Sequence, residues 1–556
     1  MDWQAVPVQL SGLPILEEGY EVPLPNHFST TSINDSVLLS IHDYLEASLT
    51  SSPWQPVSLT SLPGKEVFSH FVDLYFVHFD KFYPILHRPS FDTSKEPVLT
   101  LAVAEIGACY SGFPSARAFA TSLSELTRRL LLFMAEYDPR FVRTDSYITA
   151  QLLQSIHGFS SGSKRLYELS DSNRSSIISH ARSLKLFDHR SSLEDEGAEM
   201  DVGSRWEAWI RAEKARRLAW AICTLDASST YFHNARSLLS MNELKMDLPC
   251  STAHWQAETA QAWAALHPWT HLPPTKSLRS LLESLSISSP KSAEITDACH
   301  SHIAAIILAR SIWDLRESAL EPSALFFPND NADLRLQRMQ AILSTLQRLT
   351  SPLVPSANDL IGQDFASLVQ RTYIVHSGGI LTAEDAVDHM HIVWAKLGTR
   401  SQQAREHLLR WASRCPAQVR TTAHKAAQIL SVARRYPYNH PNEPYHVFHS
   451  GFILWTMLGL LTELPSSIPP PGSNHRRIPC RLDWHGAHDT PEALAVNDWV
   501  EHGGYGYIVG MDGAPDLVSE MGMRQVLELA ADTLKRMRVW GIAQIFLNAV
   551  LRALHD

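Results

Sequence analysis

One segment of this 556-residue sequence has the residue spacing of a hydrolase nucleophile. Residues 158–162 read Gly-Phe-Ser-Ser-Gly and match the pattern Gly-x-Ser-x-Gly, whose central serine, here Ser160, would attack an acyl carbon. That chemistry needs a strand before the serine, because a strained strand-to-helix turn must expose the hydroxyl oxygen. The preceding residues 151–157 have a helical pattern instead. We therefore predict a Ser-Gly loop between two helices and no hydrolase chemistry.

Two short stretches concentrate side chains that can bind a metal ion. They are Cys299-His300-Ser301-His302 and the group His440, Glu443, His446 and His449. Thiolate, imidazole and carboxylate groups are the ligands that zinc prefers. Adjacent residues of a helix diverge around its axis, so one helix face cannot present all of the first stretch. We interpret the histidines of both stretches as structural, and we predict no metal site, no cofactor and no catalytic residue.

A glycine-rich run and a basic run raise the question of phosphate binding. The run Gly503-Gly504-Tyr505-Gly506 follows a helical stretch and lacks the strand, turn and helix of a phosphate loop, so we predict a flexible surface loop. Arg216 and Arg217 lie close in sequence to Glu213 and Asp226. We predict that both arginines make ion pairs or buried structural contacts and do not bind phosphate.

The charge balance opposes extended contact with nucleic acid. Lys and Arg total 48 against 58 Asp and Glu, which gives a net charge of -10, and this field repels a phosphate backbone. Direct DNA contact would need a local basic patch, for which residues 214–217 and 475–477 are the nearest candidates. The six cysteines have no Cys-x-x-Cys spacing, which favours a reducing compartment. The apolar stretch 451–461 is too short to cross a bilayer, so we expect no membrane association.

Helical periodicity dominates the chain from about residue 64 and predicts an all-α fold. In residues 335–349 the apolar side chains recur at three- and four-residue spacings and line one helix face. A second such face runs from Trp206 to Leu225. The aromatic side chains that recur along residues 71–82 predict a stripe packed in the core; they are Phe71, Tyr75, Phe79 and Phe82. Helical breaks are predicted near residues 191–203, 322–333 and 464–489.

Three segments organise the predicted fold. Residues 1–63 form a mostly irregular leader with one short helix near residues 37–49. Residues 64–270 form a helical regulatory region, and residues 271–556 form its helical continuation.

The order of several motifs resembles the fungal-specific transcription factor domain, also called the middle homology region. The motifs are Tyr-Pro-Ile-Leu-His-Arg-Pro-Ser-Phe at 83–91, the small-residue helix 101–110, Gln-Leu-Leu at 151–153, Ala-Arg-Ser-Leu at 181–184, Arg-Arg-Leu-Ala-Trp at 216–220 and Leu-Pro-Cys at 248–250. Residues 448–455 and 538–542 are similar to late helices of members that carry two-Cys two-His zinc fingers. Residues 231–236 replace the Gly-Arg-Pro turn common in relatives. The resemblance covers about residues 65–555 and implies an all-helical regulatory body.

Family members carry a zinc-based DNA-binding module before this region, whereas the first cysteine here is Cys109. A zinc cluster needs clustered thiolates, so we expect no such module before residue 64. An upstream exon encoding zinc fingers is an open alternative. The resemblance implies a nuclear transcriptional regulator of a metabolic or secondary-metabolite gene cluster, not an enzyme. We expect indirect DNA association through a protein partner, either a DNA-binding regulator or a second copy of the chain, and consider a small-molecule effector.

Two other classes of function stay open at this stage. The first is a cytoplasmic ligand sensor, or a scaffold that sequesters a related full-length regulator through helix faces. The second is an enzyme built on the same helical body, which turnover of a metabolite would reveal. Association with chromatin separates the regulator from the cytoplasmic sensor.

Overall fold

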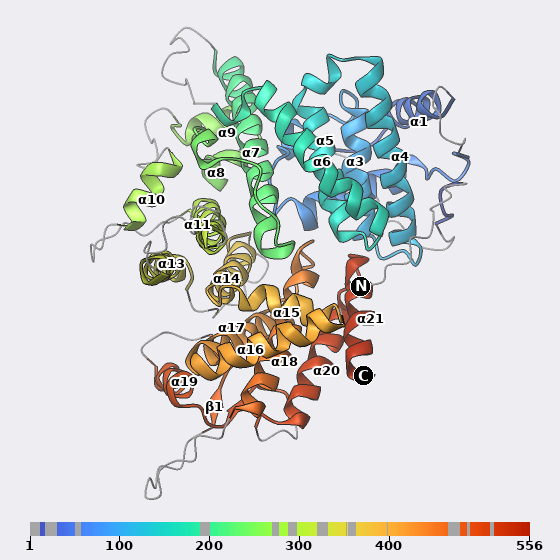
Figure 1. Ribbon diagram of the computed structural model, residues 1–556. Helices are drawn as coiled ribbons and strands as arrows, with labels where there is room; N and C mark the ends of the chain where they lie inside the picture. The colour runs from blue at the N-terminus through green and yellow to red at the C-terminus, as the bar shows by residue number, and fades with distance from the viewer. Residues whose placement is uncertain are drawn as a thin grey trace, which may run out of the picture.

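The computed structural model describes most of the chain. The described residues are 12–16, 31–50, 57–188, 201–268, 277–286, 297–319, 332–351, 353, 363–396, 398–464, 479–485, 490–511 and 516–555. The fold is almost entirely helical, which confirms the predicted all-α class (Figure 1). The predicted breaks at 191–203 and 322–333 lie mostly outside the described residues.

Six helices form the first part of the body, at the blue and cyan end of the chain in Figure 1. They are α1 (Asp35–Thr50), α2 (Lys65–Leu74), α3 (Pro97–Cys109), α4 (Ala116–Tyr137), α5 (Asp145–Ser160) and α6 (Lys164–Ser183). The predicted helix near residues 37–49 is confirmed as α1, which packs on α3 and α4 and buries Val37, Ile41 and Leu45.

The aromatic stripe is a packed core element, as predicted. Phe71, Tyr75 and Phe79 are completely buried, and Phe82 is partly buried with its ring against His440. Helix α2 does not continue as a regular α-helix, because its last part winds as a π-helix, η1 (Tyr75–Phe79). The sequence pattern does not predict this wider turn.

Long helices occupy the middle of the chain. They are α7 (Val202–Phe232), α11 (Ala298–Ser318), α13 (Ala332–Gln347) and α14 (Gln363–Leu381), with the shorter α8 (Thr252–Trp255), α9 (Ala260–Ala265) and α10 (Leu278–Ser286) at one side (Figure 1). The apolar face predicted within residues 335–349 is confirmed, since Met339, Leu346 and Leu349 are buried. Helix α7 packs against α5, α6, α11 and α14, and so lies between the early and late helices.

The late helices pack around α18 (Figure 1). They are α15 (Ala386–Trp394), α16 (Thr399–Arg414), α17 (Pro416–Arg435), α18 (Glu443–Glu463), α19 (Pro491–His502), α20 (Glu520–Arg536) and α21 (Ile542–His555). Short 3-10 turns complete the described elements, namely η2 (Arg88–Ser90), η3 (Phe141–Arg143), η4 (Leu186–Asp188) and η5 (Met241–Glu243). One hydrophobic cluster extends from α1 to α21. Every helix among the described residues is too short or too polar to span a bilayer.

Two short strands lie where we predicted loops. Strand β1 (Cys480–Arg481) pairs in parallel with β2 (Gly506–Tyr507). The interpretation of residues 503–506 as a flexible surface loop is therefore wrong for Gly506, which is buried. A Cβ at this glycine would lie 2.9 Å from Leu482 Cδ1. Strands of two residues are too short for an alternating sequence pattern to reveal them.

The end of α5 and the start of α21 meet without intervening side chains. A Cβ on Gly541 would lie 2.0 Å from the carbonyl oxygen of Ser161, and Gly162 has a φ of +80° that favours glycine. Tyr445 Oη also donates a hydrogen bond of 2.6 Å to the carbonyl oxygen of Phe159. Backbones that are far apart in sequence are therefore in direct contact.

Glycine is also required where α3 crosses α2, and Gly107→Ala tests this requirement. A Cβ at Gly107 would lie 1.8 Å from the carbonyl oxygen of Phe71, and a backbone atom cannot rotate away. We expect this substitution to lower the free energy of unfolding by about 3 kcal/mol, the upper end of typical overpacking costs. Urea denaturation measures the change.

Gly459→Ala in α18 is the matched control, because its Cβ would meet only Met523 Sδ at 3.5 Å. Alanine favours a helix over glycine by about 1 kcal/mol, so this variant should keep or gain stability. Equal unfolding midpoints for the two variants would contradict the close packing at Gly107.

Candidate regulatory site

Ser160 lies at the last position of α5, where no strand precedes it. Its side chain is buried, and Ser160 Oγ donates a hydrogen bond of 3.2 Å to the carbonyl oxygen of Pro441. A Cβ at Gly158 would lie 1.9 Å from Ser170 Oγ, so this glycine allows α5 to pack closely on α6. The predicted loop between two helices is confined to residues 161–163, because residues 158–160 belong to α5 itself. The serine joins α5 to the segment before α18.

The stretch 299–302 forms the first turn of α11 and does not present its side chains on one face. Asp297 caps this helix by accepting hydrogen bonds from the backbone N–H groups of Cys299 and His300. His300 Nε2 donates to the carbonyl oxygen of Pro249 at 2.8 Å. His302 is half-buried, and burial lowers its pKa to about 3. These contacts are structural, as the sequence interpretation predicts.

The second group lies on and just before α18. Glu443 is completely buried and accepts hydrogen bonds from Tyr373 Oη at 3.1 Å and from the backbone N–H of Tyr438 at 3.3 Å. Burial raises the pKa of Glu443 to about 7 despite these donors. His446 stacks on the ring of Tyr373 with the centroids 4.5 Å apart.

Two groups of three side chains in the described part of the chain bring their ligand atoms within 4.8 Å of one another. They are Asp385, His389 and His407, and His42, Asp43 and Glu46. Neither group contains a residue of the two stretches that the sequence singled out.

A small cavity of about 40 Å³ lies where α7, α14, α15, α17 and α18 meet. Three of its lining residues are His391, His446 and His449, and burial lowers the pKa of each, that of His446 to about 3. Tyr231 and Phe232 also line it, and they begin the segment that departs from the family pattern. Such a volume holds water molecules but no metabolite. The cavity is therefore a mainly apolar pocket with three neutral imidazoles in its lining, at the junction of five helices.

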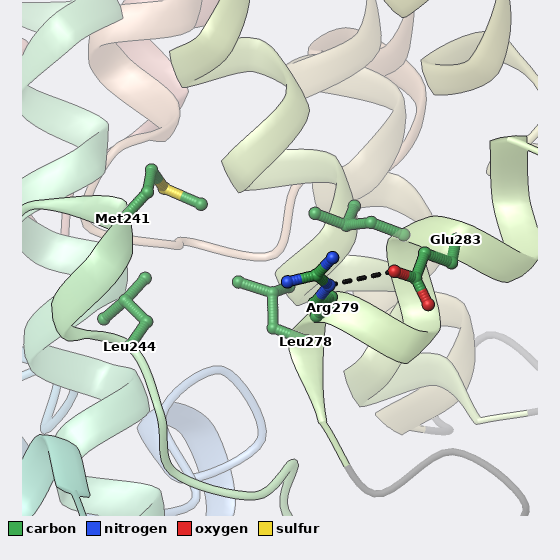
Figure 2. A pocket seen from close by; sticks show the side chains of 6 residues that line it. Met241, Leu244, Leu278, Arg279 and Glu283 are labelled. Atoms are coloured by element: carbon green, nitrogen blue, oxygen red, sulfur yellow. Dashed lines mark hydrogen bonds and ion pairs between the residues drawn. The ribbon is translucent and has the colours of Figure 1, made fainter.

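A larger groove of about 390 Å³ lies between η5 and α10 (Figure 2). Its apolar lining consists of Met241, Leu244, Leu278 and Leu282. The polar lining is an ion pair in which Arg279 Nε lies 2.9 Å from Glu283 Oε1. This volume falls within the range of small-molecule sites, which combine apolar walls with a few polar groups. The groove was not found from the sequence, because its walls come from two separate segments.

The two arginines of the basic run on α7 are buried in ion pairs, as predicted for Arg216 and Arg217. Both guanidinium groups contact the carboxylate of Glu213, which is completely buried, and Arg217 Nε lies 2.9 Å from its Oε1. Glu213 Oε1 also accepts a hydrogen bond of 2.8 Å from the backbone N–H of Cys250. Arg217 lies 4.3 Å from the ring centroid of Trp255. This network fixes α7 to the Leu-Pro-Cys segment and leaves neither arginine exposed.

A buried acid–base pair between α3 and α5 was missed by the sequence analysis. His157 Nδ1 lies 3.1 Å from Glu105 Oε1, and both side chains are almost completely buried. The side chain of Cys109 also hydrogen-bonds with His157, and the pKa of the histidine rises to about 10 because Cys109 and Glu105 outweigh the opposing effect of burial. These residue types can perform nucleophilic chemistry, but here they lie inside the helix packing. No sequence signal joins them, since the two helices meet only in the fold.

A family model for the fungal specific transcription factor domain matches residues 72–345. This match includes the aromatic stripe from Tyr75 to Phe82 and the Glu213 network. The chain carries a fungal specific transcription factor domain. The resemblance inferred from the motif order is thereby confirmed for residues 72–345.

This chain spans only about a quarter to a third of the length of the relatives that it matches. Zinc finger protein zas1 of Schizosaccharomyces pombe is 28% identical over 43% of this chain and 26% of the relative. The nicotinate catabolism cluster-specific transcription factor of Emericella nidulans is 26% identical over 38% of this chain and 24% of the relative. Zinc finger protein klf1 of Schizosaccharomyces pombe is 24% identical over 46% of this chain and 34% of the relative. No solved structure matches the chain.

The substitution Glu213→Gln tests whether the buried carboxylate holds this part of the domain together. The amide keeps the shape but leaves Arg216 and Arg217 without a neutralising charge, so we expect a loss of about 3 kcal/mol in the free energy of unfolding. Chemical denaturation gives the value. Glu207→Gln removes an exposed carboxylate from the same helix and should cost less than about 0.5 kcal/mol. A similar small loss for both variants would contradict the structural role of Glu213.

The neutral histidines predict a specific dependence of stability on pH. The pKa of His446 is about 3 in the folded protein, against 6.5 without the fold. As the pH falls below 6.5, His446 therefore takes up a proton in the unfolded chain but stays neutral in the folded protein. Stability should therefore decline from pH 6.5 towards pH 3. The variant His446→Phe keeps a ring beside Tyr373. Between pH 7 and pH 5 it should lose about 1 to 2 kcal/mol less unfolding free energy than the wild type.

Unfolding free energies at several pH values measure this difference. The exposed residue His555 supplies the control His555→Phe, which should follow the wild-type pH curve. A wild-type curve that coincides with that of His446→Phe would show that His446 takes up its proton in the folded protein.

Proposed function

We propose that this protein is a nuclear transcriptional regulator of a metabolic or secondary-metabolite gene cluster. The observation that carries the proposal is the match of residues 72–345 to the fungal specific transcription factor domain. Among the relatives, one is a nicotinate catabolism cluster-specific transcription factor, and others are transcription factors. The regulator acts through protein contacts of its helical body.

DNA association is indirect in this proposal, and a DNA-binding protein or a second copy of the chain recruits the helical body to promoters. The net charge of -10 supports indirect association, because it opposes approach to a phosphate backbone. The burial of Arg216 and Arg217 gives further support, since both are neutralised by Glu213 inside the fold. The other basic run, residues 475–477, lies outside the described residues.

The groove between η5 and α10 is the proposed site of a small-molecule effector. Its lining favours a mainly apolar molecule with one polar group that can reach Arg279 or Glu283 (Figure 2). Helix α10 packs on α11, and α11 packs on α7 and α14. An effector that binds only one arrangement of α10 would shift the population of that arrangement. The effector would thus control which surface is offered to the partner.

Chromatin immunoprecipitation of the tagged full chain in its native cells tests the regulator proposal. We expect sharp peaks at promoters, and their loss when the gene for the recruiting DNA-binding partner is deleted. Absence of promoter enrichment under inducing conditions, with the chain well expressed, would overturn the proposal. That result would favour the cytoplasmic sensor or sequestering protein instead.

The same cells test the effector groove through Leu282→Glu, which puts a charge among the apolar lining residues. Promoter peaks should remain while the response of target transcripts to inducing conditions is lost. Leu494→Glu is the matched control, because Leu494 is 65% exposed on α19. An unchanged response in Leu282→Glu would remove the groove from the mechanism without affecting the promoter assignment.

A further inference from the structure

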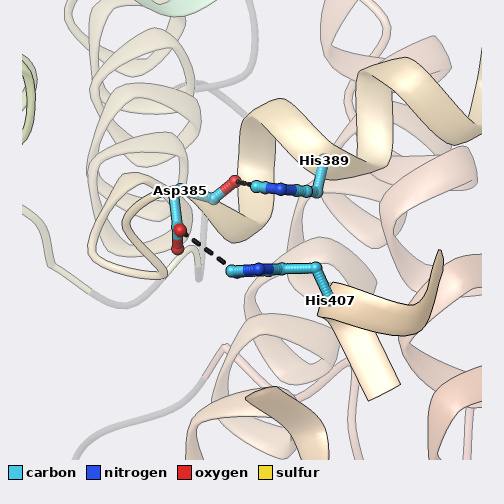
Figure 3. A group of neighbouring side chains, drawn as sticks. All are labelled: Asp385, His389 and His407. Carbon is cyan, nitrogen blue, oxygen red and sulfur yellow. Dashed lines mark hydrogen bonds and ion pairs between the residues drawn. The ribbon is translucent and has the colours of Figure 1, made fainter. Parts of the chain in front are cut away.

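A carboxylate and two imidazoles meet where α15 packs on α16. Asp385 is the residue before α15, His389 lies four positions later, and His407 comes from α16. The three side chains offer ligand atoms that all lie within 4.8 Å of one another. Figure 3 shows the two rings lying parallel, each with an edge towards Asp385, and their centroids are 3.9 Å apart.

The hydrogen bond of His389 determines which of its nitrogens is free. His389 Nδ1 lies 2.9 Å from the backbone carbonyl oxygen of Asp385, and a carbonyl oxygen can only accept. Nδ1 therefore carries the proton, and Nε2 has a lone pair. Histidine ligands of metals are held in this way, with the second ring nitrogen donating to a carbonyl or carboxylate. The fold thus fixes His389 in the tautomer that a metal ion requires.

His407 and Asp385 supply the other two ligand atoms. His407 Nε2 lies 3.1 Å from Asp385 Oδ2, a separation that two ligands of one small cation can adopt. The side chain of His407 is 30% exposed and that of Asp385 is 47% exposed, so an ion can enter from solvent. Their exposure also leaves room for the small rotations that would turn the parallel rings towards one ion.

Neighbouring basic side chains already have acidic partners of their own. Arg335 lies 2.9 Å from Glu384, and Arg316 lies 2.8 Å from Glu317 and 3.6 Å from Asp388. The ion pair that the structure describes for the Asp385 carboxylate is the one with His407 Nε2.

We propose that Asp385, His389 and His407 bind one divalent cation of the Zn²⁺ class. Two imidazole nitrogens and one carboxylate oxygen are zinc ligands, and water would complete a tetrahedral site. Where Nε2 of His407 carries a proton, binding releases that proton to solvent. The ion joins α15 to α16, and α15 also contributes Val387 and His391 to the small cavity beside α18. Occupancy of the site therefore stabilises the position of α15 on α16.

Isothermal titration of the metal-free, reduced full chain with ZnCl₂ tests the site. We expect binding of one ion that His389→Ala and His407→Ala each weaken by at least about tenfold. Asp385→Asn keeps the shape of the side chain and should weaken binding as well. Zn²⁺ should also raise the melting temperature of the wild type, because a ligand that binds only the folded state stabilises it. Circular dichroism shows whether each variant is folded.

His42→Ala is the matched control. His42 lies 3.6 Å from Glu46 on α1, in the other acid–histidine group, which has no second histidine. Zn²⁺ affinity should stay within about twofold of the wild type in this variant. Absence of one-to-one binding by the wild type would overturn the proposal. Binding that survives in the double variant His389→Ala/His407→Ala, or that His42→Ala abolishes, would place the ion elsewhere and equally overturn it.

Discussion

The carboxylate of Glu213 lies inside the protein, and the middle of the fold is arranged to neutralise it. A buried charge is tolerated only when opposite charges and hydrogen-bond donors surround it. Arg216 and Arg217 supply the charge from the next turn of α7, and the backbone N–H of Cys250 supplies a donor. Because Cys250 comes from a different segment, the requirement brings the Leu-Pro-Cys segment onto α7. His300 then binds the carbonyl oxygen of Pro249 and adds α11 to the same assembly.

A second buried carboxylate on α7 has an equivalent role near the other end of the helix. Asp226 accepts hydrogen bonds from the backbone N–H groups of Leu238 and Leu239, and Arg174 Nη2 lies 3.0 Å from its Oδ1. These contacts fold the chain back after α7 and attach it to α6. The segment 231–236, which departs from the family pattern, lies between α7 and this return. Its first residues, Tyr231 and Phe232, line the small cavity. The segment that differs from the family pattern therefore begins where the early and late helices meet.

Much of the helical framework could be predicted from the sequence because it depends on local spacing. The apolar residues within 335–349 recur with a helical period, and the buried positions of Met339 and Leu346 agree with it. The arginines of α7 could be assigned to ion pairs because Glu213 lies three and four positions before them. Local spacing could not reveal the π-helical turn at 75–79. That turn depends on how α2 packs against α3.

The sites depend on contacts between segments that are distant in sequence. Asp385 and His389 have the spacing of neighbours on a helix, but His407 joins them only because α16 packs against α15. The same applies to Glu105 and His157, which lie on α3 and α5. Residues 299–302 and 440–449 drew attention in the sequence because they are dense in ligand types along the chain, and we interpreted their histidines as structural. In the fold, His300 binds a backbone carbonyl oxygen and His446 stacks on Tyr373, so these rings have structural contacts.

Signals within this body must pass through packed contacts, because the early and late helices share one hydrophobic cluster. The backbones of Gly162 and Gly541 touch, and Tyr445 binds the carbonyl oxygen of Phe159. Close-packed interfaces of this kind adopt discrete arrangements and resist gradual deformation. The groove lies on α10, which packs on α11, and α11 packs on α7 and α14. A ligand there can influence distant surfaces only if it favours one arrangement of α10 and α11, so differential affinity, not tight binding alone, sets the size of any regulatory effect.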